Sequence, residues 1–375
     1  MEIIERKKKT YLSYKDIEKC VKKNDLQYLI LIGQRSNGKS YASKELALRN
    51  AFSKGEQFTY LRRRKEDLQE YMIIEYFADM LEPIHRNGCN KIQDITQNEY
   101  DTIAVYRKGI YFAKTGENDK VERGIQVGYA HALSGLEGIK SRQFPKVTMI
   151  LFEEFIATGL YLWDEPTLLQ NYTSTIFRDR KGCVIMIGNT ISRIVPYFTE
   201  WMLDNVPKQP QSSLEVYNFK TGETETRIGV FLCGSLQSNS GMFFGSAAKM
   251  IVGGEWDRAE QPKLARPLEE YETLYRMVFK FSEQAMFLMS FIWLKADHST
   301  RLWYVEPKTT QIRPGTRVIC PEMHEDLLWT RDFKPLTNKE NTLFLYYEMG
   351  KIAFSDNLTG TEFNRCVAQM GKRKK

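Results

Sequence analysis

The feature that most constrains this fold is a glycine-rich segment between an apolar run and a helical pattern. Residues 28–33 read YLILIG, and residues 33–40 read GQRSNGKS, which fits G-x-x-x-x-G-K-[ST] without a mismatch. Glycines let a backbone turn around an anion, and the N–H groups that open the following helix point toward it. The sequence therefore predicts a phosphate cradle between a strand at Tyr28–Gly33 and a helix at Ser40–Gly55.

Residue types within the cradle predict separate roles. Lys39 is expected to reach the β and γ phosphates of a nucleoside triphosphate, and the Ser40 hydroxyl to bind Mg²⁺. The other residues expected to line the phosphates are Gly33, Gln34, Arg35, Ser36, Asn37 and Gly38.

Two carboxylates follow a second apolar run. Residues 147–155 read VTMILFEEF, so a buried strand is expected to end at Glu153 and Glu154. We assign Glu153 to Mg²⁺, held through a water molecule, and Glu154 to the activation of the attacking water. Aspartate is the usual first acid, but the longer arm of Glu153 still reaches through water. A solvated acidic turn is the alternative interpretation.

The next apolar run, residues 183–188, ends at Asn189. A polar side chain there would sense the γ phosphate, although asparagine also commonly ends strands in turns. Candidates for a cation that acts on a neighbouring subunit's phosphate are Lys140, Arg142, Arg178 and Arg180, for which surface ion pairs or DNA contacts are the alternatives. Arg62, Arg63 and Arg64 follow another strand near the nucleotide edge, and Arg35 lies inside the cradle.

Hydrophobic patterning divides the chain into two domains. Alternating apolar runs and helical patterns predict an α/β unit with a mostly parallel sheet over residues 1–233. It includes hairpins that turn at Lys108-Gly109 and at Thr221-Gly222. Residues 234–268 are predicted to form a linker with a short helix. Long strands follow, at 275–282, 285–296 and 300–307, and predict a smaller, partly antiparallel α+β domain at 269–375.

Charge and cysteine usage limit the environment and the partners. The net charge of +7 suits a polyanionic partner without identifying one. The six cysteines have no metal-binding spacing, so reduced thiols are expected. No signal peptide or bilayer-length apolar run is present, which predicts a cytosolic protein without membrane association.

Four segments together resemble one known family, the genome-packaging (DNA-encapsidation) ATPases of small short-tailed phages with protein-primed linear genomes. They are IGQRSNGKSY at 32–41, KGEQFTYLRRRKEDL at 54–68, ILFEEFI at 150–156 and MIGNTISRIVPYF at 186–198. The resemblance is clear over about the first 230 residues and holds beyond them by order and length.

The resemblance implies a P-loop ATPase of the additional-strand, catalytic-glutamate class, with ATP and Mg²⁺ as cofactors. It implies a homomeric ring, of five subunits, docked on the portal vertex of a procapsid, with a structural RNA as adaptor in some relatives. Lys39, Ser40, Glu153, Glu154 and Asn189 would keep the roles given above. Lys140 and one of Arg178 or Arg180 would act in trans. The expected location is the cytoplasm of the infected host and, transiently, the procapsid vertex.

Related terminases join their motor to an RNase H-like nuclease, whose metal sites need several carboxylates. Here the strand that would supply the first acid offers Lys280, with Glu283 only at its far end. We therefore expect a nuclease-like second domain without the catalytic acids. The overall hypothesis is an ATP-driven translocase of double-stranded DNA. The alternatives are a P-loop kinase of a small molecule and a nucleotide-gated assembly protein.

Overall fold

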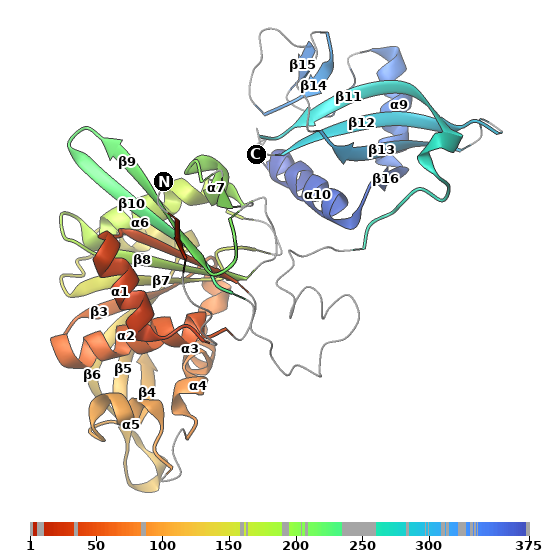
Figure 1. Ribbon diagram of the computed structural model, residues 1–375. Coiled ribbons are helices and arrows are strands. Elements are labelled where there is room, and N and C mark those ends of the chain that lie inside the picture. The colour runs from red at the N-terminus through yellow and green to blue at the C-terminus, as the bar shows by residue number, and fades with distance from the viewer. Residues whose placement is uncertain are drawn as a thin grey trace. The chain divides into compact units, whose positions relative to one another are not determined.

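The chain folds into two compact units, which are described separately (Figure 1). One is formed by Met1–Ile191 with Asn205–Glu255, and the other by Ser192–Asp204 with Trp256–Lys375. The computed structural model describes residues 3–5, 11–33, 37–83, 88–157, 161–162, 164–189, 195–203, 205–206, 209–234, 260–282, 285–296, 298, 300–308, 312, 315–321, 328–330, 333, 335 and 337–372. Within those ranges, no helix is both long enough and apolar enough to cross a membrane.

The first unit is built on a ten-stranded sheet. In spatial order its strands are β1 (Ile3–Glu5), β9 (Ser213–Thr221), β10 (Thr224–Leu232), β2 (Tyr28–Gly33), β8 (Cys183–Asn189), β7 (Val147–Glu153), β3 (Gln57–Arg62), β6 (Val121–Ala132), β5 (Gly109–Thr115) and β4 (Thr102–Tyr106). The six from β10 to β6 are parallel, and antiparallel strands extend the sheet at both ends. The expected mostly parallel α/β sheet is therefore confirmed.

Strand β8 lies between β2 and β7, and this placement positions the candidate site. Gly33 pairs with Asn189 across β2 and β8, and Glu153 pairs with Ile187 across β7 and β8. Because the three strands are parallel, their carboxyl ends meet at one edge of the sheet. The glycine-rich turn, the carboxylates and Asn189 are thereby brought to that edge.

Helices cover both faces of this sheet (Figure 1). The helical segments of the unit are α1 (Tyr14–Asn24), α2 (Lys39–Lys54), η1 (Lys65–Leu68), α3 (Glu70–Tyr76), α4 (Ala78–Leu81), α5 (Lys91–Thr96), η2 (Glu117–Asp119), η3 (Leu133–Ile139) and α6 (Glu165–Phe177). Side chains from α1 to α5 share one core cluster with Ala130 and Ala132 of β6. The intervening His131 faces the other way, where its Nδ1 lies 2.8 Å from the Tyr172 hydroxyl of α6. Helix α6 therefore packs on the opposite face.

The strands of the parallel core are apolar because both of their faces are covered. All six residues of β2 are buried, as are the first six of β8. Such strands read as continuous apolar runs rather than as alternating ones. This explains why the bounds expected for β2 agree with the structure, as does the expected end of β8 at Asn189.

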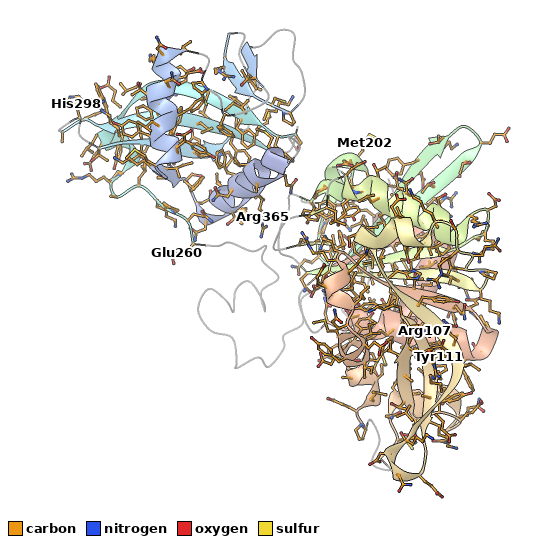
Figure 2. The ribbon with its side chains drawn as sticks, turned by 180° about the vertical axis from the view of Figure 1, so that it is seen from behind. Arg107, Tyr111, Met202, Glu260, His298 and Arg365 are labelled. Atoms are coloured by element: carbon orange, nitrogen blue, oxygen red, sulfur yellow. The ribbon has the colours of Figure 1, made fainter. Side chains whose placement is uncertain are left out.

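The predicted turn of the β4–β5 hairpin is wrong by one residue. Arg107 and Lys108 form the two-residue loop, both with positive φ, and Gly109 pairs with Tyr106 as the first residue of β5. Figure 2 labels Arg107 on this hairpin, with Tyr111 near it. Gly109 is needed for space, since a Cβ there would lie 2.8 Å from the Tyr111 ring. The second hairpin turns at Gly222-Glu223, one residue beyond the expected position.

The second unit contains a six-stranded sheet. Its order is β15 (Leu328–Thr330), β14 (Arg317–Ile319), β11 (Tyr271–Lys280), β12 (Met286–Leu294), β13 (Arg301–Pro307) and β16 (Ile352–Phe354). The expected antiparallel run β11–β12–β13 is confirmed. The helical segments are α7 (Pro196–Glu200), η5 (Leu268–Glu270), α9 (Asn338–Glu348) and α10 (Asn357–Lys372). Residues 235–259, where the linker helix was expected, lie outside the described residues, as does Glu283.

Candidate nucleotide-binding and catalytic site

The two glycines of the glycine-rich turn have the features that a phosphate cradle requires. Gly38 has φ +84° and caps the N-terminus of α2, so a side chain there would be strained. Gly33 ends β2 so close to its neighbours that a Cβ would lie 2.5 Å from Asn37 Nδ2 and 2.8 Å from the Cys233 side chain. Gln34, Arg35 and Ser36, the predicted ligands between them, lie outside the described residues.

Lys39 is held inside this turn. Its Nζ donates to the Gly33 carbonyl at 3.1 Å and to Asn37 Oδ1 at 2.9 Å, and the residue is 4% exposed. Burial lowers the pKa of Lys39 to about 8, against the opposing effects of Cys233 and Glu153. The amide Nδ2 of Asn37 is buried without a partner among the described residues. A buried N–H donor of this kind suits an anion that would enter the turn.

Ser40 and Glu153 meet across the carboxyl edge of the sheet. The Ser40 hydroxyl donates to Glu153 Oε2 at 3.1 Å, and the Tyr76 hydroxyl of α3 donates to Glu153 Oε1 at 2.8 Å. Burial raises the pKa of Glu153, and the two donated hydrogen bonds oppose that rise. The sequence predicts that Ser40 and Glu153 bind one metal ion, and the structure brings them together. No local motif marks Tyr76, so the sequence did not predict its contact with Glu153.

Glu154 is the next residue but has different surroundings. Its φ is +55°, its side chain is 61% exposed, and its Oε2 accepts from Arg62 Nη2 at 2.8 Å. Arg62 is the last residue of β3, so the end of one parallel strand supports the carboxylate that follows another. Arg62 therefore lies at the carboxyl edge of the sheet, beside Glu154, as the sequence predicts.

Arg63 contacts the backbone behind Glu154. Its Nη1 and Nη2 donate to the carbonyls of Glu154 and Phe155 at 3.1 and 2.7 Å, and its Nε donates to Glu165 Oε2 at 2.7 Å. Glu165, the first residue of α6, has a fully buried side chain. Sequence reasoning missed Glu165 because its 102-residue separation from Arg63 leaves no pattern to detect.

Asn189 lies where the sequence predicted, at the end of β8 beside Gly33, and is half-buried. The turn that follows β7 packs against the same strand, since Phe155 N–H donates to the Ile187 carbonyl at 3.2 Å. A Cβ at Gly188 would lie 2.7 Å from the Phe155 ring. The turn that carries Glu154 is therefore packed against the strand that ends at Asn189.

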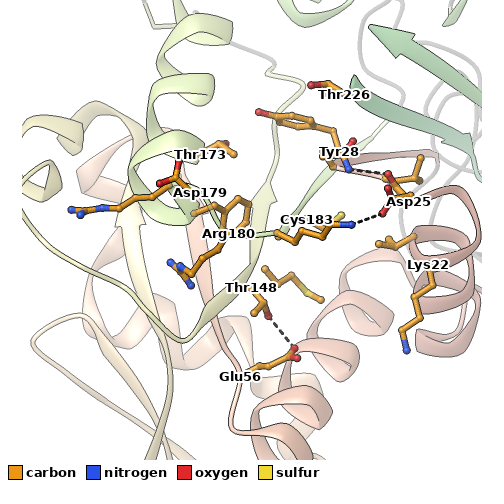
Figure 3. Close-up of a pocket in the computed structure, with 18 of the residues that line it drawn as sticks. Lys22, Asp25, Tyr28, Glu56, Thr148, Thr173, Asp179, Arg180, Cys183 and Thr226 are labelled. Carbon is orange, nitrogen blue, oxygen red and sulfur yellow. Dashed lines mark hydrogen bonds and ion pairs between the residues drawn. The ribbon is translucent and has the colours of Figure 1, made fainter. Parts of the chain in front are cut away.

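Two other predicted residues, Arg178 and Arg180, lie away from this edge. Arg178 and Arg180 follow α6 and precede β8, about 20 Å along the strands from the carboxyl ends. Arg180 lines a pocket of about 940 Å³ at the amino ends of the strands (Figure 3). Its guanidinium donates to four main-chain carbonyls, those of Phe144, Pro145, Val147 and Ile176.

Arg178 is exposed, and its Nη2 lies 3.4 Å from the Arg142 carbonyl. Lys140, at the end of η3, is also exposed and pairs with Glu137. None of these three residues contacts Lys39 or Glu153 among the described interactions. Any catalytic role for them therefore belongs to the site of another subunit, and that role stays a prediction.

The residues present fit a nucleotide with Mg²⁺. Hydroxyl and carboxylate oxygens, as supplied by Ser40 and Glu153, are the donors that Mg²⁺ prefers. No group of three or more His, Cys, Asp or Glu side chains is placed to hold a metal ion in the described part of the chain. Mg²⁺ commonly takes one or two protein ligands and completes its shell with phosphate oxygens and water.

A glycine turn from a buried parallel strand into a helix, with a carboxylate two strands away, is consistent with the P-loop class of nucleotide-binding folds. Comparison with known proteins makes the assignment narrower. The model of the family described as "Podovirus DNA encapsidation protein (Gp16)" matches residues 10–221, more than half of the chain. The chain belongs to this family.

Curated relatives agree with this assignment. A DNA packaging protein of Bacillus phage B103 is 34% identical over 172 residues, which cover 45% of this chain and 46% of that protein. A DNA packaging protein of Bacillus phage phi29 is 31% identical over 172 residues, or 45% of this chain and 44% of that protein. The chain therefore matches about half the length of these relatives.

The fold as a whole also has a known counterpart. A chain of "The bacteriophage Phi-29 viral genome packaging motor assembly" superposes with a TM-score of 0.51 and 19% identity. The superposition covers 96% of this chain and 100% of that chain. At this identity the likeness shows a shared fold, and it extends over both units.

Proposed function

We propose that this chain is an ATP-driven translocase that packages double-stranded phage DNA into a procapsid. Membership of the encapsidation family supports this proposal. The observation that carries it is the 3.1 Å contact between Ser40 and Glu153, with Glu154 as the next residue. These groups belong to a site that hydrolyses a nucleotide rather than one that only binds it.

The chain's own residues would divide the work. Lys39 and Asn37 would donate to the phosphates, and Ser40 and Glu153 would hold Mg²⁺. When bound, Mg²⁺ supplies positive charge that stabilises the oxygens of the transferring phosphoryl group. Glu154 would accept the proton of the attacking water, for which its exposed carboxylate is accessible. Arg62 pairs with Oε2 of that carboxylate, so Oε1 would accept the proton while the pair is intact.

Coupling to movement would start at Asn189, which lies between the phosphate cradle and the catalytic turn. We propose that it senses loss of the γ phosphate, and that Lys140 and Arg178 or Arg180 act at a neighbour's site in a ring. Grip on DNA would be mainly to backbone phosphates, because a motor must move any sequence. The net charge of +7 suits that partner.

We propose further that the ring has five subunits and acts on the portal vertex of a procapsid in the infected host, with a structural RNA as one candidate adaptor. We also propose that residues 1–233 form the motor domain, residues 234–268 the linker and residues 269–375 the second domain.

The second unit would be a nuclease-like domain that does not cut DNA. Its strand order supports the RNase H-like part, because a β11–β12–β13 meander is extended by parallel β14 and β15 on the β11 side. β11 has one carboxylate, Glu272 at its second residue, and ends in Lys280, and β14 carries no carboxylate. These residues favour contact with nucleic acid or another motor component over metal-dependent cleavage.

ATP hydrolysis measured with and without double-stranded DNA tests the proposed function. Lys39→Ala should abolish nucleotide binding and hydrolysis. Glu154→Gln should retain nucleotide binding and slow turnover by about 10²–10⁴-fold, the usual contribution of a general base. Glu117→Gln, which changes an exposed glutamate on η2, is the matched control and should behave as the wild type. Normal turnover in Glu154→Gln would refute the catalytic assignment.

The same assay separates the alternatives. A P-loop kinase would transfer phosphate to a small molecule without dependence on DNA. An assembly protein gated by nucleotide would bind ATP with little turnover in either condition. Hydrolysis that increases several-fold with double-stranded DNA supports translocation over both.

A further inference from the structure

The further inference concerns Arg63, whose guanidinium donates three hydrogen bonds to described residues behind the catalytic turn. Two go to consecutive carbonyls, of Glu154 and Phe155, and the third goes to Glu165. The charge also lies over aromatic rings, 4.9 Å from the Tyr161 centroid and 6.0 Å from that of Phe152. A planar group with donors in fixed directions can hold three acceptors at once, which an ammonium group cannot match.

The backbone that Arg63 holds is unusual. Glu154 has φ +55°, a left-handed conformation that costs a residue with a Cβ about 1 kcal/mol or more. Such a conformation persists when the surroundings fix it, and the two donations from Arg63 hold the carbonyl of Glu154 itself and that of the next residue, Phe155. The direction of the Glu154 side chain follows from that backbone.

Glu165 fixes Arg63 in turn. Its Oε2 accepts from Arg63 Nε at 2.7 Å and from Leu162 N–H at 2.8 Å. The Arg63 side chain is 10% exposed and that of Glu165 is not exposed. A buried pair with added hydrogen bonds is rigid, and removal of one partner leaves an uncompensated charge. The catalytic turn is thereby connected to the first residue of α6.

Arg62 and Arg63 therefore bind different parts of Glu154. Arg62 pairs with the exposed carboxylate of Glu154, which exchanges readily with solvent or substrate. The described hydrogen bond from Arg63 to Glu154 goes instead to the main-chain carbonyl. A change at Arg62 acts on the charge of the base, whereas a change at Arg63 acts on its position.

We propose that Arg63, anchored by Glu165, is a positioning residue that sets the geometry of Glu154 for hydrolysis. This inference rests on the proposed function, because it takes Glu154 as the base. It predicts that loss of Arg63 slows the chemical step and leaves nucleotide binding intact, since the described hydrogen bonds of Arg63 and Glu165 go to the turn after β7 and not to Lys39 or Ser40.

Arg63→Lys in the full-length chain tests this. Lysine keeps the charge beside Glu165 but cannot reach three acceptors, so the turn should relax. Displacement of a catalytic group by about 1 Å costs about 100-fold in rate, and we expect kcat to fall by about that factor. The affinity for a fluorescent ATP analogue should stay within about twofold. Arg317→Lys is the matched control.

Arg317 also forms a buried pair, with Glu340 at 3.1 Å, but in the second unit. The control should therefore lose a similar amount of stability while its basal kcat stays that of the wild type. An equal loss of kcat in both variants would mean that Arg63 acts only through stability. An unchanged kcat in folded Arg63→Lys would also overturn the inference.

A double-mutant cycle with Glu154→Gln distinguishes positioning from an independent contribution. If Arg63 acts through Glu154, Arg63→Lys should not slow the residual turnover of Glu154→Gln further. Multiplicative losses would contradict the proposal. Normal turnover in Glu154→Gln alone is a different result, which refutes the proposed function itself.

Glu165→Gln serves if Arg63→Lys does not fold. The amide keeps an oxygen acceptor for Arg63 but loses the charge that anchors it. We expect kcat to fall by about tenfold, with unchanged nucleotide affinity. A folded Glu165→Gln protein with wild-type kcat would show that the anchor has no catalytic role.

Discussion

Replacement of Arg180 by alanine should destabilise the first unit by about 2–4 kcal/mol. The guanidinium donates to Pro145, Phe144, Val147 and Ile176 carbonyls at 2.6, 2.8, 3.1 and 2.7 Å. Each such hydrogen bond contributes about 0.5–1.5 kcal/mol net. The expected loss of stability is smaller than the sum of the four upper values, because these carbonyls are only partly buried and water can reach them in the variant.

Urea unfolding followed by circular dichroism measures this effect. With a denaturant slope of about 2–3 kcal/mol per molar, the midpoint should fall by about 1 M. Arg178→Ala is the control, since Arg178 is exposed and should change stability by less than about 0.5 kcal/mol. Equal midpoints for the two variants would refute the interpretation of Arg180 as a structural residue. A loss of activity in Arg180→Ala should therefore be interpreted only beside its stability.

Three further predictions concern the core and the catalytic turn. Burial lowers the pKa of His131 to about 4, so the unfolded chain binds a proton between pH 6.5 and 4 that the folded chain does not. Stability should therefore be lost as the pH falls through that range, by at most about 3 kcal/mol, and His131→Gln should remove this contribution in unfolding measured against pH. Tyr76→Phe removes a donor to the buried Glu153, and the unfolding free energy should fall by about 1–2 kcal/mol, whereas an unchanged unfolding free energy would mean that this hydrogen bond does not stabilise the fold. Gly188→Ala places a methyl group 2.7 Å from the Phe155 ring, so ATP turnover should fall at least about tenfold with nucleotide affinity retained, and normal turnover would show that the turn can shift freely.

The phosphate cradle and its strands could be predicted because local sequence determines them. The structure places β2 at Tyr28–Gly33, as expected, since an apolar run buried on both faces ends at a glycine. β8 likewise ends at the expected Asn189. The meeting of Ser40 and Glu153 also followed, because parallel strands bring their carboxyl ends to one edge. A motif that determines both its own backbone conformation and the strand and helix beside it can be recognised in a single sequence.

The supporting contacts could not be predicted, because they join residues far apart in the chain. Tyr76 reaches Glu153 across 77 residues, and nothing in its own segment marks it as part of a site. The sequence predicts a β4–β5 turn at Lys108-Gly109 because glycine favours turns, whereas Arg107 and Lys108 adopt positive φ and Gly109 leaves room for a ring. Tertiary packing decided both cases.

The parallel pairing of β10 with β2 also has a consequence for synthesis and for fragment design. The strand that precedes the phosphate cradle gains its second neighbour only from Ile228–Leu232, about 200 positions later, and Cys233 N–H then donates to the Ile32 carbonyl at 2.7 Å. At bacterial rates of about 5–20 residues per second, a ribosome takes roughly 10–50 s to reach that strand. Until then β2 has an open edge, which is a template for aggregation. A fragment that stops at residue 221, where the family match ends, would keep that open edge permanently.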